Sequence, residues 1–319
     1  MQQKHLFIMD PVEKLNLARD SSLRIAYALS HRNQALYFCE TQDLFWKSGQ
    51  EPHCRARSIQ FSNSAEHFEL GREEECALDG FASIHMRKDP PVDIAYISAT
   101  WFLDPCKKAL VVNKPEALRG FNEKLGMLRY PNDCKTSLVS SDPEQLFYFL
   151  RDFCQGNGVL KPLHLYGGKG IEHVTLAQKS QDACLAFFKE QTEGGKVAKL
   201  LQAFDSRVYD GEIRAFTVGG KALAWCKKRP QEGKFLANTA SGASLHEFTP
   251  SRSLLQRVER VAEDLVKLGL YFIGFDIIGE EITEINVTSP RLLPAPGDSH
   301  DYYADIAEWL VQACAKQNP

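Results

Sequence analysis

The chain has 319 residues, of which 44% are hydrophobic and 25% charged, and its formal net charge is −3. These proportions are typical of globular proteins with filled interiors and exclude general disorder, while the length predicts two or three domains. Lys and Arg are dispersed along the chain, so the charge balance gives no reason to expect nucleic-acid binding.

Neither a membrane span nor a signal peptide is expected. No stretch approaches the roughly 18 consecutive apolar residues that a spanning helix needs, and the first residues, MQQKHLFIMDP, do not have the pattern of a secretion signal. The nine cysteines include no CxxC pair, which favours buried thiols in a reducing compartment over a zinc site or a disulfide framework. We therefore expect a cytoplasmic protein that does not contact membranes.

The first part of the chain alternates strand-like and helical segments. The apolar runs HLFIMD, ALYFCE, FASIHMR and KALVVNKP predict strands, and a helix is expected from about Ser21 to His31, with Asp20 as its cap. This alternation predicts a parallel sheet covered by helices. Because ligands bind at the carboxyl ends of such strands, residues 9–11 and 86–91 are candidates for binding, with ordinary strand exits as the alternative.

A second unit begins after Lys135. Asp142 and Pro143 are typical of a helix start, and the strand VLKPL follows that helix. The next segment, HLYGGKG at 164–170, is a glycine-rich turn whose backbone N–H groups could approach phosphate oxygens. It lacks the spacing of a P-loop or a dinucleotide-binding turn, so a simple hairpin turn is the alternative.

The last part contains the strand-like runs KLLQAF, EIRAFTV and KALAWCKKR, followed by a helix that starts at Thr249-Pro250 and ends at Gly269. Leu and Val recur along this helix at helical spacing, which predicts a core-facing stripe. Between the last strand and the helix lies the polar loop 229–243, which is long enough to fold over a ligand as active-site lids do.

The segment GFDIIGEEITEINVTSP, at 274–290, predicts a β-hairpin with a metal site. Asp276 should lie opposite Glu284, and Asn286 should share a face with Glu284. Carboxylate and amide oxygens are ligands for Mg²⁺, so the three side chains predict a phosphate-handling enzyme, with an exposed acidic hairpin as the alternative. Because they are expected to serve a metal and not the core, replacing Asp276 or Glu284 should leave the fold largely intact.

In these segments the chain resembles the ATP-grasp ligases, and among them the bacterial glutathione synthetases. The matching segments follow the family order over nearly the whole chain: IMDP, RKDPP, VNKPEALRGFNEKL, VLKPL, DGEIRAF and GLYFIGFDIIGEEITEINVTSP. The resemblance implies an α/β protein with a parallel-sheet N-terminal domain (1–122) that binds substrate. It also implies a central ATP-grasp subdomain (123–200) and a C-terminal one (201–319), which together form an α+β clamp.

The resemblance also implies roles for individual residues. Arg214 and Lys161 would be catalytic, facing the reacting phosphate, and Asp276, Glu284 and Asn286 would hold the metal. ATP would be bound by Lys124, Lys161, Gly167, Gly168, Gln202, Ala203, Phe204 and Asn238. The substrate would be bound by Arg87, Arg229, Ser289 and Pro290.

The implied reaction joins γ-glutamylcysteine to glycine through an acyl phosphate, with ATP and Mg²⁺, or Mn²⁺ in its place. Three features depart from the family pattern: the turn HLYGGKG lacks an acidic residue and a methionine, Leu236 replaces an arginine, and residues 291–297 replace the segment that seats the acceptor. A ligase for another carboxylate and amine, and a non-catalytic nucleotide-binding relative, therefore remain alternatives. Family members are commonly homo-oligomers, but nothing in this chain independently requires one.

Overall fold

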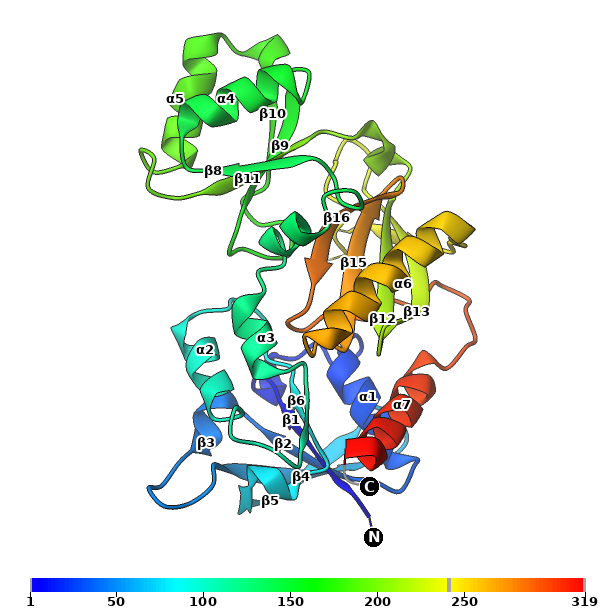
Figure 1. The fold of residues 1–319 in the computed structure, drawn as a ribbon. Helices are drawn as coiled ribbons and strands as arrows, with labels where there is room; N and C mark the ends of the chain where they lie inside the picture. The colour runs from blue at the N-terminus through cyan, green and yellow to red at the C-terminus, as the bar shows by residue number, and fades with distance from the viewer. Residues whose placement is uncertain (1, 240–241, 318–319) are drawn as a thin grey trace.

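The computed structural model describes residues 2–239 and 242–317, and the strands of this part form three separate β-sheets (Figure 1). In Figure 1 the N-terminal sheet lies at the bottom, the C-terminal sheet in the middle and the central sheet at the top. Between the strands and α-helices stand short 3-10 helices: η1 Val12–Lys14, η2 Thr41–Asp43, η3 Leu78–Gly80, η4 Leu125–Arg129, η5 Leu176–Gln178 and η6 Ser206–Tyr209.

The N-terminal sheet has a parallel centre and an antiparallel edge. Its strands are β1 Lys4–Ile8, β2 Ala35–Cys39, β3 Leu44–Phe45, β4 His53–Phe61, β5 Phe68–Ala77, β6 Ser83–Met86 and β7 Leu110–Val112. The order β2-β1-β6-β7 is parallel, as the sequence predicts. The hairpin of β4 and β5 adds antiparallel strands beside β2, which the sequence analysis did not anticipate.

Three helices accompany this sheet: α1 Ser21–Ser30, α2 Ile94–Trp101 and α3 Pro115–Gly120. Asp20 caps α1 as expected, since its carboxylate accepts a hydrogen bond from the backbone N–H of Leu23 at 2.8 Å. The C-terminal helix α7, Tyr302–Gln317, returns to this domain and packs beside α1 (Figure 1), so its apolar side chains join the N-terminal core.

The central sheet has the order β10-β9-β11-β8 and is antiparallel. Its elements are β8 Ser137–Ser140, α4 Pro143–Asp152, β9 Asn157–Pro162, β10 Glu172–Thr175, α5 Gln181–Gln191 and β11 Lys199–Ala203. Asp142 caps α4 as expected, accepting from the backbone N–H of Glu144 at 2.8 Å. The expected boundary between residues 200 and 201 falls inside β11, which pairs wholly within this sheet.

The C-terminal sheet has the order β14-β13-β12-β15-β16, and α6 covers one face of it (Figure 1). Its elements are β12 Glu212–Val218, β13 Lys221–Arg229, β14 Ser244–His246, α6 Arg252–Lys267, β15 Phe272–Ile278 and β16 Glu281–Asn286. Helix α6 begins at Arg252 and not at Thr249, because the Ser251 hydroxyl accepts from the backbone N–H of Leu254 and makes Ser251 the cap. The helix ends before Gly269, which has φ of 91°.

The hairpin of β15 and β16 confirms the predicted register. Asp276 lies opposite Glu284, Gly274 lies opposite Asn286, and a bulge follows Asp276. Alternation buries Ile285 on the far side of β16, so the polar side chains share the other face.

Asn113 joins the N-terminal and C-terminal sheets. Its amide nitrogen donates to the carbonyls of Phe272 and Val287, and its amide oxygen accepts from the backbone N–H groups of Tyr271 and Phe272, all within 2.9 Å. Four hydrogen bonds from one buried side chain satisfy its whole capacity and fix these domains against each other.

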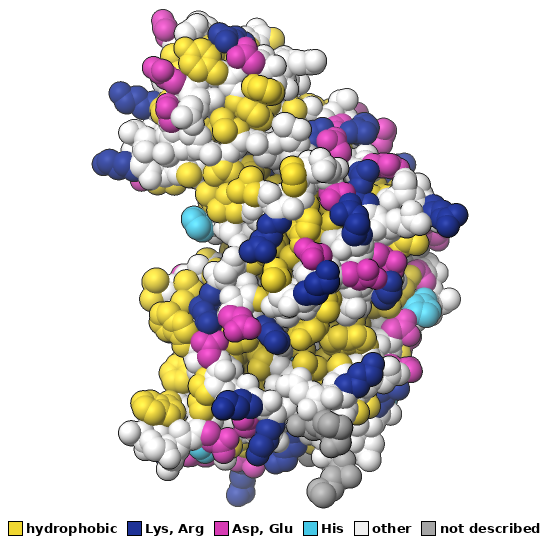
Figure 2. Space-filling model, in the orientation of Figure 1, with side chains coloured by type: hydrophobic (Ala, Val, Ile, Leu, Met, Phe, Trp, Pro, Cys, Tyr) yellow, Lys and Arg dark blue, Asp and Glu magenta, His cyan; other side chains and the backbone are white. Residues whose placement is uncertain are grey.

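The surface is hollowed on one side, between the central subdomain and the N-terminal domain (Figure 2). Hydrophobic side chains are visible in the neck that joins the upper and middle parts of the molecule (Figure 2). Among residues 2–239 and 242–317, no helix has both the length and the apolar character to cross a bilayer.

Candidate functional site

A cavity lies between the central and C-terminal sheets and brings most of the predicted nucleotide and metal residues together. Strands supply most of these side chains, while the glycine turn and the lid loop supply the rest. The predicted residues that line it are Lys161, Gly167, Gly168, Gln202, Ala203, Phe204, Arg214, Asn238, Asp276, Glu284 and Asn286.

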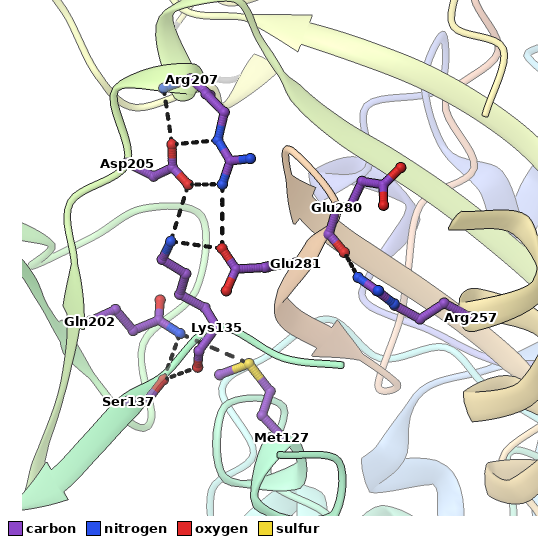
Figure 3. A network of polar contacts seen from close by, with 9 residues as sticks. All are labelled: Met127, Lys135, Ser137, Gln202, Asp205, Arg207, Arg257, Glu280 and Glu281. Atoms are coloured by element: carbon purple, nitrogen blue, oxygen red, sulfur yellow. Dashed lines mark hydrogen bonds and ion pairs between the residues drawn. The ribbon is translucent and has the colours of Figure 1, made fainter. Parts of the chain in front are cut away.

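One end of this cavity is aromatic. Phe204 follows β11, and Phe235 comes from the lid loop; their ring centroids are 6.2 Å apart, and His173 stacks on Phe204 at 4.3 Å. Flat apolar surfaces of this kind suit a planar heterocycle. The Gln202 side chain instead donates to the Ser137 hydroxyl at 2.9 Å (Figure 3), and its backbone pairs with Ser137 and Val159 in the central sheet, so this residue supports the cavity wall.

A polar network beside the aromatic end fastens the central subdomain to β16 (Figure 3). The Lys135 ammonium lies 3.1 Å from Asp205 and 2.8 Å from Glu281, and Arg207 contacts both carboxylates. Hydrogen bonds from Arg207 hold the pKa of Asp205 well below its usual range, with Lys135 acting in the same direction. Asp205 therefore carries a constant negative charge on the cavity wall.

The opposite end of the cavity is charged, and Asp276 is at its centre. One carboxylate oxygen lies 2.7 Å from the Lys228 ammonium and 3.2 Å from Nε of Arg214, while the other accepts from the Asn286 amide at 3.0 Å. Burial by itself raises the pKa of Asp276, but Arg214 and Lys228 outweigh it and hold that pKa far below the usual range. The carboxylate is ionised and tightly held.

These contacts correct the expectation that Asp276 serves a metal and not the core. The residue is only 6% exposed, and it neutralises two buried cations. Removing one partner of a buried ion pair typically costs about 3 to 5 kcal/mol, because the remaining charge is left uncompensated. Asp276 therefore supports the fold as well as the site.

Glu284 is differently placed. One of its oxygens lies 2.9 Å from the Lys124 ammonium, which also donates to the Leu165 carbonyl at 2.9 Å. Lys124 lines a neighbouring cavity and not the main one, so its contact with the site runs through Glu284. Lys161 lines the main cavity, and burial lowers the pKa of its ammonium although Glu284 acts against this shift.

Arg214 extends over a glycine of the next strand. A Cβ added to Gly274 would collide with Nη1 of Arg214 and would lie 3.1 Å from Cβ of Pro290. Nη1 is buried and forms no hydrogen bond within the described structure, so it is an unused donor at the charged end of the cavity.

A second cavity adjoins the first. Ser289 and Pro290, two of the predicted substrate residues, line it together with Asp89, Glu123 and Lys228. The side chains and glycine that line both cavities are Tyr166, Gly167, Arg214, Asn238 and Asn286. The charged end of the first cavity therefore opens on the second.

Two predicted substrate residues do not reach either cavity. Arg87 is only 5% exposed. It donates to the Ser22 hydroxyl at 3.0 Å and to the carbonyl of Pro290, a residue that lines the second cavity, at 3.1 Å. Arg229, at the end of β13, is exposed and donates to the Asp210 carbonyl at 3.1 Å. Arg87 thus supports the cavity wall, while Arg229 lies away from it.

Sequence analysis missed Glu212 and Lys228. The Lys228 ammonium bridges Asp276 and Glu212, at 2.7 and 2.5 Å. Burial raises the pKa of Glu212 to about 7, although Lys228 acts to lower it. Period-two alternation could have found Glu212, because it lies two residues before Arg214 and on the same face of β12.

Sequence analysis also missed Glu123, in the NEKL segment. Its buried carboxylate accepts from the backbone N–H groups of Val287 and Thr288 and from the Thr288 hydroxyl, at 2.9 to 3.1 Å. Burial raises the pKa of Glu123, and Glu284 adds to the increase. Glu123 therefore fixes the residues that follow β16 against the segment that precedes η4.

Comparison with known families agrees with this geometry. The model of the prokaryotic glutathione synthetase N-terminal domain matches residues 3–119, and the model of the ATP-grasp domain of the same enzymes matches residues 123–294. The chain belongs to the prokaryotic glutathione synthetase family. It is accordingly an ATP-dependent carbon–nitrogen ligase that acts on small molecules.

Curated relatives match over most of their length. A glutathione synthetase of Pseudomonas syringae pv. tomato is 35% identical over 293 residues, covering 90% of this chain and 89% of that one. A glutathione synthetase of Photorhabdus laumondii is 34% identical over 289 residues, covering 89% of each chain. The family match ends at residue 294, inside the departing segment 291–297.

Solved structures confirm the fold. The D-cycloserine synthetase DcsG has a TM-score of 0.67 at 11% identity, and the alignment covers 97% of this chain and 99% of that one. The ATP-grasp ligase PsnB, solved with a minimal precursor, has a TM-score of 0.63 at 15% identity and covers 98% and 99%. At these identities the likeness establishes the ATP-grasp fold alone.

Proposed function

We propose that this chain joins γ-glutamylcysteine to glycine at the junction of its two cavities, releasing ADP and phosphate. The observation that carries the proposal is that Arg214, Asn238 and Asn286 line both cavities. A phosphoryl group delivered from the first cavity would meet a carboxylate held in the second. The curated relatives named glutathione synthetase support the choice of substrates.

In the first step, a carboxylate oxygen attacks the γ-phosphorus of ATP, and ADP leaves. Lys161 and Arg214 supply positive charge where the transferring group gains negative charge. Because Nη1 of Arg214 forms no hydrogen bond within the described structure, it can donate to the phosphoryl group without first breaking another hydrogen bond. The aromatic end, with Phe204 and Phe235, would take adenine and set the direction of the triphosphate.

Glu284 and Asn286 are suited to hold Mg²⁺, or Mn²⁺. The Asn286 amide nitrogen donates to Asp276 and to the Gly274 carbonyl, which leaves its amide oxygen free for a cation. Glu284 keeps one oxygen beyond its ion pair with Lys124. One oxygen of Asp276 faces both Arg214 and Lys228, while the other accepts from the Asn286 amide and keeps a lone pair for the cation. When bound, the metal neutralises charge on the phosphates.

In the second step, the amine attacks the acyl carbon and phosphate leaves, so water must be kept from the acyl phosphate. The lid lies against the glycine turn, since a Cβ added to Gly168 would collide with the Asn238 amide. This contact closes the junction from the side of residues 235–238.

We place the reaction in the cytoplasm, as a proposal that rests on the thiols. All nine cysteines are free, and most are buried. A chain with nine unpaired thiols is suited to a reducing compartment.

The proposal is tested by measuring phosphate release with ATP, Mg²⁺, γ-glutamylcysteine and glycine, with each component omitted in turn and the product identified by mass. Glutathione formed only in the complete mixture is the expected result. Phosphate release with a different amine or carboxylate, but not with this pair, would favour the alternative ligase. Binding of ATP without turnover of any pair would favour the non-catalytic relative.

A further inference from the structure

A third cavity adjoins the second one, which is lined by Ser289 and Pro290 and which we call the reaction cavity. Thr239, Arg291 and Leu293 line both of them, so the two spaces meet along the departing segment 291–297. The other walls come from α1 and the residues before it, from the chain leaving the lid loop, and from Tyr303 of α7. We call this third cavity the annex.

The annex is cationic. Arg19, Arg24 and Arg291 line it, and no Asp or Glu is among the lining residues of the described structure. Arg24 donates to the Ala18 carbonyl at 2.7 Å and lies 3.7 Å from Glu66, outside the cavity wall. Three guanidinium groups without a carboxylate in the wall favour an anionic ligand, and the planar fork of arginine suits a carboxylate.

Arg291 also has a special position in the reaction cavity. Arg214 and Lys228 line that cavity too, but both face the carboxylate of Asp276. Arg291 is half-buried, and its recorded partner is the neutral Thr239 hydroxyl at 3.3 Å. Among the described residues that line the reaction cavity, Arg291 is therefore the cation that forms no ion pair with a carboxylate.

The geometry points to the annex as an extension of the acceptor site, in which Arg291 binds the carboxylate of the incoming amine. This inference rests on the proposed function. An amine that attacks at the junction extends its remaining atoms toward Arg291. Because the annex continues the reaction cavity beyond Arg291, the chain accepts amino acids or short peptides that carry a free carboxylate further from the amine.

The chemistry is unchanged for a longer acceptor. The amine nitrogen forms a bond to the acyl carbon, the carbon–oxygen bond to phosphate breaks, and the displaced proton goes to solvent. Leu292 and Leu293, with Pro294 and Pro296, give the annex apolar walls that suit the methylene and peptide groups of such an acceptor.

The test compares glycine, glycylglycine and glycinamide as acceptors, with ATP, Mg²⁺ and γ-glutamylcysteine and with mass detection of each product. We expect glycylglycine to give a tetrapeptide with kcat/KM within about tenfold of glycine. Glycinamide, which lacks the carboxylate, should fall about 10- to 100-fold, the range for one lost charge-assisted hydrogen bond.

The variant Arg291→Gln should raise KM for glycylglycine by about 10- to 100-fold while kcat changes little, because binding and not phosphoryl transfer is affected. Arg72→Gln, on the exposed face of β5, is the matched control and should behave as wild type. A thermal melt of each variant separates a folding defect from a binding one.

If the protein forms glutathione from glycine but does not ligate glycylglycine, the annex is not part of the acceptor site, while the proposed function still holds. Unchanged KM values in Arg291→Gln would lead to the same conclusion. If no amine gives a product, the proposed function is wrong, and so is the inference that the annex extends the acceptor site.

Discussion

The nucleotide cavity and the acceptor side of this molecule are built differently. In the first, the charged side chains around Asp276 stand on β9, β12, β15 and β16, and Asp276 contacts both Arg214 and Lys228. On the acceptor side, Ser289 to Leu293 and Thr239 lie on loops, and Arg291 has a single long hydrogen bond at 3.3 Å.

This difference separates what the fold fixes from what a loop can change. A substitution on one of these strands also disturbs the packing of the sheet and breaks a shared ion pair. The end of the cavity that handles ATP is therefore constrained by stability as well as by catalysis. A loop residue with one weak contact can be replaced at little cost. The departures at Leu236 and at 291–297 fall on loops, as this contrast leads one to expect.

The sharpest test of the contrast compares two neighbours in the ladder, Glu284 and Asp276. Glu284→Gln should lower kcat by about 100-fold or more and raise the Mg²⁺ concentration needed for half-maximal rate, because it removes a metal ligand. The thermal midpoint should fall less than that of Asp276→Asn, because the Lys124 ammonium loses one ion pair but keeps its hydrogen bond to the Leu165 carbonyl. Asp276→Asn should also lose activity, but with a destabilisation of about 3 to 5 kcal/mol, because the buried Arg214 loses its carboxylate partner while Lys228 keeps only Glu212.

Denaturant unfolding and Mg²⁺ titration of both variants check these outcomes. Near-normal Mg²⁺-dependent turnover in Glu284→Gln would show that the metal assignment is wrong. Equal stability of Asp276→Asn and wild type would show that Arg214 and Lys228 find other partners, and would remove the distinction between the two carboxylates.

A smaller effect is expected where the two regions meet, at Gly274. An alanine there would push the Arg214 guanidinium aside, since the added Cβ collides with its end and approaches Pro290 at 3.1 Å. We expect Gly274→Ala to lower kcat about tenfold while ATP affinity stays close to wild type, because Arg214 acts on the transferring group. Steady-state kinetics and nucleotide binding measure the two effects separately.

Gly80→Ala is the matched control, because an added Cβ at Gly80 meets no atom within 4 Å. If Gly274→Ala weakened ATP binding as much as it slowed turnover, Arg214 would belong to ground-state nucleotide binding and the junction would have to be placed elsewhere.

Alternation along strands explains why part of the site could be predicted from sequence and part could not. The register of β15 and β16 places Asp276 opposite Glu284, as a period of two dictates. The same period on β13 turns Lys228 inward and Arg229 outward. Choosing Arg229 from the family pattern therefore missed the cavity by one residue, which in a strand is a change of face.

Long-range contacts were beyond sequence reasoning. Arg87 follows β6 as predicted, but its burial depends on Ser22 and on Pro290, which are distant in the chain. The antiparallel hairpin of β4 and β5 was missed for a different reason: β5 carries few inward apolar side chains, so its pattern resembles a polar loop.

The smallest expected effect concerns Glu212, whose titration makes the stability of the buried network in the nucleotide cavity depend on pH. Burial raises the pKa of this carboxyl to about 7, above the roughly 4.3 of glutamate in an unfolded chain. A raised pKa means that the folded state binds the proton more tightly, so this contribution to stability is fully present below about pH 4 and is lost as pH rises through 7.

Glu212→Gln removes this titration, so its thermal midpoint should fall less than that of wild type between pH 5 and pH 8. Melting both proteins across this range, without nucleotide or metal, measures the difference, and Glu73→Gln on exposed β5 controls for loss of a surface carboxylate. Parallel curves for Glu212→Gln and wild type would mean that Lys228 keeps Glu212 ionised throughout. The cavity would then carry its full negative charge at every pH at which the enzyme works, and ATP binding would depend on the metal to the same extent across that range.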